Sequence, residues 1–406
     1  MYPRDDRQAG LLRTAQRLAA DFAERAAAHD RDGSFPHENV AAMREAGYLA
    51  VAVPREYGGA GHGLAAVTLA QLALAKGDGS TALAIGMHLM VCGTEGATRS
   101  WPVPLRARIF RDVVEHGALV NNVAAEPELG SPQGGGRPAT TLRPDGPGRW
   151  RLSGHKTFTT LAPALTYFIT YAAVEDGSGD VARVAVHRDL PGIRIDETWD
   201  ALGMRATGSH DVYFDDVTVS DDDFANRRDP RDRAAAPSAG GAWFPTLVGA
   251  ASLGVAEAAR DYAVHFARTR RPTGALHPIA KIPAVRDQVG RMDAALMAAR
   301  TLLLATASDW DEHPEARIAL GPQVAAAKRL ATNTAVDVAE IAMRLVGGVA
   351  LQRGEPLERY FRDVRSGLVN PPIDARALET IAAAALDMPD LDAGQARGGR
   401  ANLDPD

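Results

Sequence analysis

The apolar positions in the first 118 residues recur at the spacing of helices. The runs 11–29 and 65–77 are rich in alanine and leucine, with apolar residues three or four positions apart. Residues 54–61 lie between such runs and contain Gly58-Gly59, a pair that tolerates backbone angles other residues avoid. The pattern predicts an N-terminal helical domain, residues 1–118, with a loop at 54–61.

Between residues 119 and 222 the spacing of the apolar positions shortens to two residues. Val184 and Val186, and then Ile193 and Ile195, alternate with polar residues, as in half-buried strands, and turn residues fall between the runs. The intervals are too short for the crossover helices that a parallel sheet requires. This region therefore predicts a small antiparallel barrel or sandwich.

A polar stretch separates this region from a second helical one. Residues 221–242 combine charges, proline, glycine and serine, which indicates an exposed linker. Beyond it, 282–303 and 324–345 carry apolar stripes with a period of about 3.5, typical of helices packed nearly antiparallel. We expect a four-helix bundle over 243–388 and a frayed tail over 389–406. The predicted fold class is α+β, mostly α: an N-terminal helical domain, a central antiparallel β-barrel and a C-terminal four-helix bundle.

Composition and charge narrow the partners. The chain has 406 residues, 46% of them hydrophobic, and a net charge of −6, which argues against nucleic acid or an anionic membrane surface. Its single cysteine, Cys92, excludes an internal disulfide and fits a reducing, cytoplasmic compartment. The first residues lack the apolar core of a signal peptide, and no segment reaches the roughly 20 apolar residues of a membrane span.

Local motifs define no reaction by themselves. The glycine pattern at 77–82 follows a helical run rather than a strand, so we interpret it as a chance match to a dinucleotide motif. The histidines are not in ligand spacing, and we expect no metal site. His88 could face a cavity or be an ordinary helix histidine, and the residue alone favours the second interpretation.

Five strings, taken in order, resemble the acyl-CoA dehydrogenase superfamily of flavoproteins along nearly the whole chain. They are AAEPELGSP (124–132), LSGHKTFTT (152–160), ALGMRATGSHDVYFDDVTV (201–219), RTRRPTG (268–274) and GGVALQRGEPLERYFRDVR (347–365). The resemblance implies a non-covalent FAD, with FMN as the alternative, between the barrel and the bundle. It also implies a homodimer or homotetramer in which a second subunit completes the adenosine end of the site.

The resemblance carries specific cofactor contacts to this chain. They fall on Ala125, Ser131, Phe158, Thr160, Arg270, Gly347 and Gly348. Phe158 would pack on the isoalloxazine and Thr160 would hydrogen-bond near flavin N5, because a flavin needs an apolar face and fixed donors at its polar edge. Arg270 would reach the pyrophosphate of the FAD bound to the neighbouring subunit.

Each of these positions also has a structural interpretation. Phe158 could be barrel core, and Arg270 a solvated charge at a helix end. Gly347 and Gly348, which would let the backbone approach the cofactor, could also end a helix. Ser131 would contact flavin or the acyl substrate, and Ala125 stands where the family usually has threonine.

This chain departs from the family at the catalytic base. Where a glutamate is expected after the ERxxRD string, the chain has Pro371-Pro372, and the alternative position of the glutamate holds Phe244 beside Trp243. Asp374, three residues further on, is the best substitute and could lie one helical turn away in the same cleft. It could equally be the N-cap of the helix that follows.

Two functions follow from the resemblance. The first is an FAD-dependent oxidoreductase acting on the CH–CH group of an acyl thioester, such as an acyl-CoA, or of a related substrate, with Asp374 or an unrecognised residue as base and a separate electron acceptor. The second is a flavin monooxygenase that forms a flavin hydroperoxide with oxygen and acts on a small apolar or aromatic substrate beside Trp243 and Phe244. A carboxylate at the substrate face favours the first function; an apolar lining with a histidine such as His88 favours the second. A non-enzymatic binding protein is a distant third interpretation.

Overall fold

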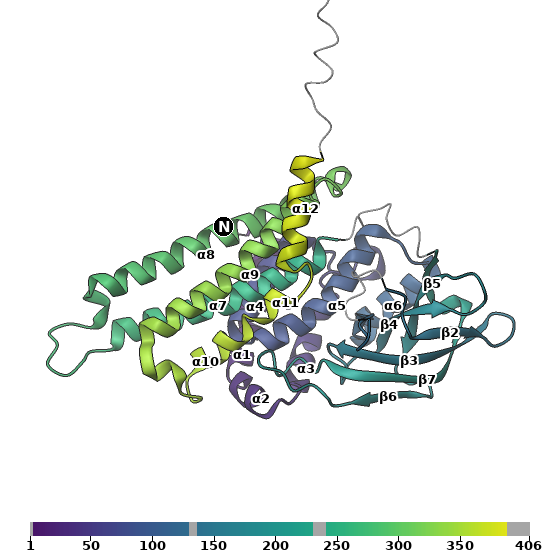
Figure 1. Ribbon diagram of the computed structural model, residues 1–406, viewed down its shortest axis with the longest axis horizontal. Coiled ribbons are helices and arrows are strands. Elements are labelled where there is room, and N and C mark those ends of the chain that lie inside the picture. Colours follow the sequence, from purple (N-terminus) through teal and green to yellow (C-terminus); the bar gives the residue numbers. More distant parts are fainter. Residues whose placement is uncertain (1–2, 130–135, 230–240, 388–406) are drawn as a thin grey trace, which may run out of the picture.

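The computed structural model describes residues 3–129, 136–229 and 241–387, and it has helical, sheet and helical regions in the predicted order (Figure 1). The N-terminal helices are α1 (Asp6–Ala23), α2 (Ala26–Asp32), α3 (His37–Glu45), α4 (Leu64–Gly77), α5 (Gly79–Thr98) and α6 (Val103–His116). The strands are β1 (Val120–Val123), β2 (Thr141–Pro144), β3 (Arg149–Thr159), β4 (Tyr167–Val174), β5 (Val181–His187), β6 (Ile193–Asp196), β7 (His210–Ser220) and β8 (Phe224–Arg228). The C-terminal helices are α7 (Trp243–Thr269), α8 (Pro283–Glu312), α9 (Gly321–Val346), α10 (Pro356–Asp363), α11 (Ser366–Val369) and α12 (Asp374–Leu386).

The two helical regions share one hydrophobic core. Helix α4 is buried on nearly all sides and packs against both α7 and α8, and a helix that is apolar all round must lie inside a core. The carboxylate of Asp311, on α8, accepts the backbone N–H groups of Leu64 and Ala65 at 2.9 and 2.8 Å, so a C-terminal helix satisfies the first turn of α4. The four C-terminal helices predicted from the apolar stripes are present: α7, α8 and α9 pack on one another and α12 packs on α9, with the N-terminal helices packed onto them.

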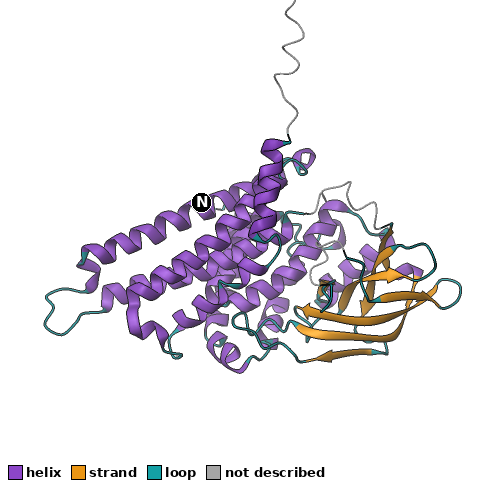
Figure 2. Ribbon diagram, in the orientation of Figure 1, coloured by secondary structure: helices purple, strands orange, loops and turns teal. Residues whose placement is uncertain are grey.

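The sheet corrects the prediction of an antiparallel barrel in two respects. Its strand order is β6-β7-β3-β2-β4-β5-β8, and the edge strands β6 and β8 do not pair with each other, so the sheet is open. Strand β4 pairs in parallel with β1 along its first half and with β2 along its second half. The strands lie together at one end of the molecule (Figure 2). Alternation fixes which residues face the core, but it carries no information on closure or strand direction.

Two loop predictions have different outcomes. The predicted linker 221–242 begins with structure, since Phe224–Arg228 forms β8 and pairs with β5, and residues 230–240 lie outside the described residues. The glycine pattern at 77–82 is the junction of α4 and α5, where Asp78 caps α5 by accepting the backbone N–H of Ser80 and Thr81. It is therefore a helix start and not a dinucleotide loop.

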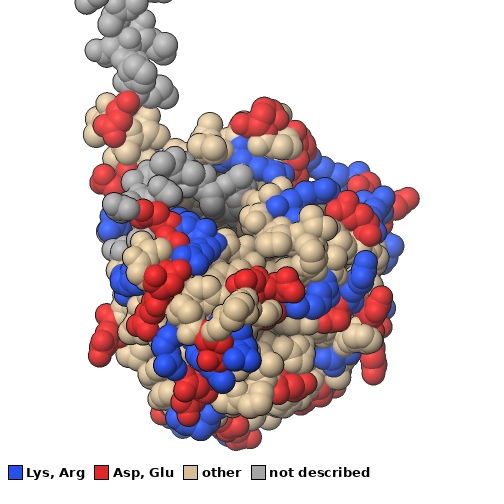
Figure 3. All heavy atoms as spheres, turned by 90° about the vertical axis from the view of Figure 1, so that its right-hand side faces the viewer, with Lys and Arg blue, Asp and Glu red and all other residues tan. Residues whose placement is uncertain are grey.

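The surface and the helices bear on the partners that the sequence analysis considered. On the face shown in Figure 3, Lys and Arg side chains alternate with Asp and Glu and form no broad field of one sign. Among the described residues, no helix has the length and apolar character of a membrane span. Nor do those residues include a group of three His, Cys, Asp or Glu that could hold a metal ion.

Candidate functional site

The first two family strings come together where strand β3 ends. The backbone N–H of Thr157 donates to the carbonyl of Ala125 at 3.0 Å, which places segment 124–129 beside the end of β3. Ser131, the other predicted residue of this string, lies outside the described residues.

A buried ion pair anchors this junction. The Lys156 ammonium donates to Glu126 Oε1 and to the carbonyl of Tyr171, both at 2.6 Å, and both charged side chains are buried. Glu126 also accepts the backbone N–H groups of Ala139 and Thr140 at 2.7 and 3.1 Å. Burial opposes ionisation of Glu126, but the hydrogen bonds from Lys156, Thr140 and Ala139 outweigh it and hold its pKa below the ordinary 4.5. The pair therefore ties β3 to the segment that carries Ala125.

Phe158 lies on the surface and not in the core. Its side chain is 64% exposed, and its backbone has φ +53°, a left-handed conformation at a register shift between Lys156 and Thr159 of β3. The irregular backbone turns the ring out of the sheet, where it meets Trp199 edge to face at 5.8 Å between ring centres. The indole N–H of Trp199 donates to the carbonyl of Met204 at 3.0 Å. Phe158 thus presents an exposed aromatic ring whose position is fixed by its contact with Trp199.

Hydroxyl groups from two strings form a chain next to this ring. The Thr160 hydroxyl bonds to the Ser209 hydroxyl at 2.9 Å, and Ser209 bonds to Thr207 at 2.8 Å. Thr207 donates to the carbonyl of Met204 at 3.0 Å, and the carbonyl of Thr160 accepts the side-chain amide of Asn121 at 3.0 Å. This network fixes Thr160 where its hydroxyl can also serve a ligand.

A buried carboxylate connects the same loop to the C-terminal helices. Asp363, the last residue of α10, accepts the backbone N–H of Met204 at 2.6 Å, and Met204 has φ +54°. A Cβ on Gly203 would lie 2.6 Å from the backbone carbonyl of Arg362, so only glycine allows this approach. Burial raises the pKa of Asp363 to about 7, since desolvation penalises its charged form. The position of Trp199, and through it Phe158, thus depends on α10.

Arg270, Gly347 and Gly348 lie elsewhere in the same chain. Arg270 ends α7 and is exposed, and Gly347 ends α9 with φ +73°, a conformation that favours glycine. A Cβ on Gly347 or Gly348 would meet no atom within 4 Å. The loop from α7 to α8 and the end of α9 lie at the left of Figure 1, opposite the sheet. Arg270 and the two glycines therefore lie at the end of the chain opposite the sheet that carries Phe158.

His88 has a structural setting. It is fully buried, and its Nε2–H donates to the carbonyl of Leu49 at 2.8 Å while Nδ1 accepts the backbone N–H of Val120 at 3.1 Å. Burial lowers its pKa to about 4, so it is neutral near pH 7. Both ring nitrogens are occupied, which fits the interpretation of an ordinary helix histidine.

The residues proposed for the substrate face also pack into the protein. Trp243 is buried, and a Cβ on Gly93 would lie 2.3 Å from its ring, so the indole rests on α5 where only glycine leaves room. Phe244 is half-buried against the same core. Trp243 is thus part of the core, whereas Phe244 keeps part of its side chain exposed.

Asp374 is neither a free carboxylate nor an N-cap. Its two oxygens accept the side-chain amide of Asn333 at 3.2 and 3.0 Å, and Oδ2 lies 3.6 Å from Nε of Arg329, both on α9. Ile373 occupies the N-cap position of α12, and Asp374 is its first helical residue. The carboxylate therefore joins α12 to α9.

Sequence reasoning missed three members of this site. Trp199, Asp363 and the Glu126–Lys156 pair all lie inside or next to the quoted strings. The signal for the pair was available, because Lys156 occupies a core-facing position of β3 and a buried lysine needs a partner. Nothing in the local pattern pairs Asp363 with Met204, since the two are 159 positions apart.

Comparison with known proteins places this geometry in context. Three family models match: "Acyl-CoA dehydrogenase, N-terminal domain" at residues 5–99, "middle domain" at 122–217 and "C-terminal domain" at 246–370. The chain is 40% identical to YdbM of Bacillus subtilis (strain 168), which is assigned by name to the acyl-CoA dehydrogenases, over 95% of this chain and 99% of that protein.

Two further relatives have names or bound ligands that do not refer to acyl-CoA. L-evernosamine nitrososynthase of a Micromonospora strain is 35% identical, over 86% of this chain and 82% of that protein. The structure of KijD3 with FMN and a dTDP-linked amino sugar is 32% identical, with a TM-score of 0.79, and the match covers 95% of each chain. All three matched regions follow the order of the helical, sheet and helical regions described above. The chain therefore belongs to the acyl-CoA dehydrogenase family.

Proposed function

We propose that this protein is a flavin-dependent oxidoreductase that works as a monooxygenase on a small organic molecule. The residues fit a flavin. Phe158 offers an exposed ring that packs on Trp199, and Thr160 offers a hydroxyl that is oriented by its hydrogen bond to Ser209. Gly347 and Gly348 border open space, as a backbone that approaches a cofactor requires. When bound in its reduced form, a flavin supplies the two electrons that activate oxygen, of which one atom enters the substrate and the other leaves as water.

Replacing Phe158 with alanine is expected to raise the flavin Kd about tenfold while leaving the apoprotein as stable as before. An aromatic contact contributes about 0.5–1.5 kcal/mol beyond burial, and an exposed side chain contributes little to folding. Flavin titration followed by fluorescence quenching measures the first quantity, and thermal unfolding of the apoprotein measures the second. Equal flavin affinity in the variant and the native chain would place the cofactor elsewhere.

The proposal takes FAD as the cofactor, with FMN as the alternative because KijD3 is described with FMN. Replacing Arg270 with alanine tests the choice. If Arg270 binds the pyrophosphate of the neighbouring subunit's FAD, its loss removes a charge-assisted hydrogen bond and raises the Kd for FAD about 10- to 100-fold. The Kd for FMN, which lacks the pyrophosphate, should not change. Chromatography of the flavin released from purified protein identifies the cofactor independently.

The hydrogen bonds of Asp374 are the observation that supports a monooxygenase over a dehydrogenase. The family's base positions hold Pro371-Pro372 and Phe244, and the remaining candidate has both oxygens bonded to Asn333 beside Arg329. A carboxylate engaged in this way is poorly placed to accept a proton from a substrate. This favours oxygen activation, which needs no such base. The name of the 35% identical nitrososynthase describes oxidation of a nitrogen, which supports the same class.

Dehydrogenation of an acyl thioester is the second candidate. The 40% identity to YdbM over 99% of its length favours it. In that case Asp374 must leave Asn333 to act as the base, and an electron acceptor must reoxidise the flavin. The two candidates make opposite predictions for the same variant.

Asp374→Asn separates them. Under the monooxygenase proposal, the variant consumes oxygen and converts substrate at the native rate after its flavin is chemically reduced. Under dehydrogenation, anaerobic mixing with acyl-CoA esters bleaches the flavin of the native protein, and loss of the base slows bleaching by about 10²–10⁴-fold. Bleaching by acyl-CoA that depends on Asp374 would overturn the proposal. Bleaching that is absent, with oxygen transfer unaffected by the substitution, would support it.

We also propose that the protein is a homodimer or homotetramer, because Arg270 and the glycines lie at the end of the chain opposite the sheet that carries Phe158. Its single cysteine, Cys92, supports a reducing, cytoplasmic compartment. Light scattering of the purified protein measures the assembly. A mixture of Phe158→Ala and Arg270→Ala chains, each weak in FAD binding alone, should recover some native sites if the two residues act across subunits.

A further inference from the structure

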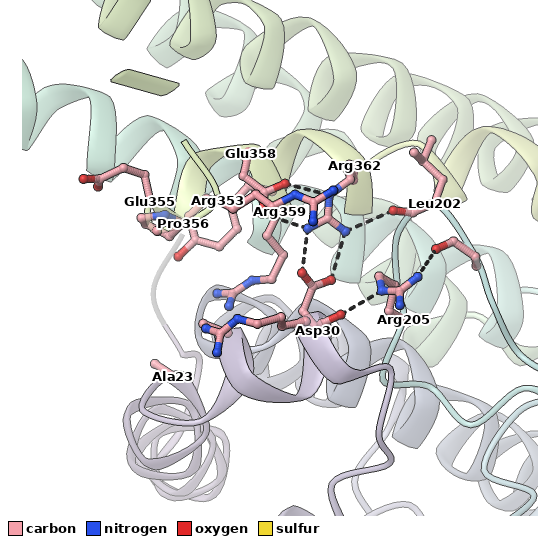
Figure 4. A pocket seen from close by; sticks show the side chains of 15 residues that line it. Ala23, Asp30, Leu202, Arg205, Arg353, Glu355, Pro356, Glu358, Arg359 and Arg362 are labelled. Atoms are coloured by element: carbon pink, nitrogen blue, oxygen red, sulfur yellow. Dashed lines mark hydrogen bonds and ion pairs between the residues drawn. The ribbon is translucent and has the colours of Figure 1, made fainter. Parts of the chain in front are cut away.

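A cavity lies away from Phe158 and Thr160. It has a volume of about 760 Å³ and is bounded by α1 and α2, by the loop 201–205 and by α10 (Figure 4). None of Phe158, Thr160, Arg270, Gly347 or Gly348 lines it. Its size lies in the range of pockets that enclose small organic molecules.

The acidic groups of this cavity are already engaged. Asp30 binds Arg362 at 2.6 and 3.0 Å, and Glu358 binds the same guanidinium at 2.8 and 2.9 Å. Glu355 accepts the hydroxyl of Tyr262 at 2.6 Å. Asp30 and Glu358 thus share one guanidinium in the wall, and Glu355 is held by Tyr262.

Three other arginines of the lining have no such partner. Within the parts of the chain that the structure describes, Arg31, Arg353 and Arg359 make no ion pair with a carboxylate, whereas Arg205 is bound to Asp200 at 2.9 Å. Arg31 and Arg353 are exposed. The cavity thus has an excess of positive charge that its own acids do not neutralise.

Arg359 provides a second and independent observation. The residue is only 7% exposed, and in Figure 4 its side chain extends from α10 across the cavity toward α2. Its guanidinium carbon lies 5.2 Å from the centre of the Tyr360 ring, and its charge acts on the buried Asp363 without forming an ion pair. A buried guanidinium is costly unless it is fully hydrogen-bonded. The Arg359 guanidinium interacts with the Tyr360 hydroxyl and also lines the cavity.

We propose that this cavity binds the phosphate or diphosphate group of a phosphorylated small molecule, with Arg359 at its base and Arg31 and Arg353 at its mouth. Planar guanidinium groups donate paired hydrogen bonds to phosphate oxygens, which makes arginine the preferred partner of such groups. The volume left beside the arginines accommodates the organic part of the ligand. The site is separate from the proposed flavin contacts and does not depend on the reaction they support.

Calorimetric titration of the flavin-loaded protein with inorganic pyrophosphate, and separately with ADP, tests the site. We expect saturable binding that weakens as salt is added. Arg359→Gln and Arg31→Gln should each raise the pyrophosphate Kd about tenfold or more. Arg111→Gln, at an exposed arginine of α6 outside the cavity, is the matched control and should leave the Kd unchanged.

Flavin content is measured in every variant. Arg31 is exposed, so Arg31→Gln remains informative if Arg359→Gln fails to fold. No heat of binding at millimolar pyrophosphate, or equal affinity in Arg31→Gln, Arg359→Gln and the native protein, would overturn the proposal. So would displacement of bound flavin by pyrophosphate, since the anion would then occupy the cofactor site. Tight ADP binding that depends on Arg359 and leaves the flavin in place would support it.

Discussion

Replacing Lys156 with methionine is expected to lower the free energy of unfolding by about 3–5 kcal/mol. The substitution removes the ammonium that lies 2.6 Å from Glu126 and leaves a buried carboxylate without its counter-charge. The carbonyl of Tyr171 loses its donor as well. Urea denaturation of the apoprotein, followed by circular dichroism, measures the change.

Two controls show whether the effect comes from burial of the pair. Arg143→Met breaks the exposed ion pair with Asp216 and should cost less than about 1 kcal/mol. The double variant Glu126→Gln/Lys156→Met should be more stable than Lys156→Met alone, because it removes the uncompensated charge. A loss from Lys156→Met as small as that from Arg143→Met would contradict this account.

The same pair sets an acid limit on stability. The folded pKa of Glu126 lies below the ordinary 4.5, so its ionised form contributes stability above that value. This contribution disappears as the pH falls through the folded pKa. Native protein should therefore lose stability below pH 4.5 in part through Glu126, and Glu126→Gln should show a flatter curve in this range.

Compared with the native chain, Asp363→Asn is expected to gain roughly 4 kcal/mol more unfolding free energy at pH 8 than at pH 4, at 1.36 kcal/mol per pKa unit. Burial raises the folded pKa of Asp363 from 3.8 to about 7. The folded state thus holds a proton that the unfolded state releases, so the native chain loses stability as the pH rises from about 4 to about 7. Asparagine keeps an oxygen for the N–H of Met204 and has no charge to bury.

The measurement is the difference in unfolding free energy between the variant and the native chain across this pH range. Asp215→Asn, at an exposed carboxylate of β7, is the matched control. If the difference for Asp363→Asn did not vary with pH, burial would not raise the folded pKa of this carboxyl group, and this account would be wrong.

The strength of each pattern decided how much of the fold could be predicted. The stripes at 282–303 and 324–345 run through long helices, and α8 and α9 confirm them. Strand β8 was missed because its arginines and asparagine face solvent at the edge of the sheet, where no alternation is required. The open, mixed sheet could not be predicted, because pairing of β4 with β1 and β2 depends on contacts distant in sequence.

The candidate site shows the same division between local and long-range information. The strings brought Phe158 and Thr160 to the correct segment, but their contacts with Trp199 and Ser209 join residues about 40 to 50 positions apart. Asp374 shows the limit in the other direction. Two prolines before a helical run predict that Asp374 is an N-cap, yet Ile373 takes the N-cap position and the Asp374 carboxylate binds Asn333.

The burial of α4 between α7 and α8 has a consequence for dissecting this protein. A fragment ending near residue 118 would leave the apolar sides of α4 in water and remove Asp311 from its first turn. Such a fragment should aggregate, and the bundle expressed alone should lack the wall that α4 supplies. Gene truncation therefore cannot isolate either helical part as a folded module.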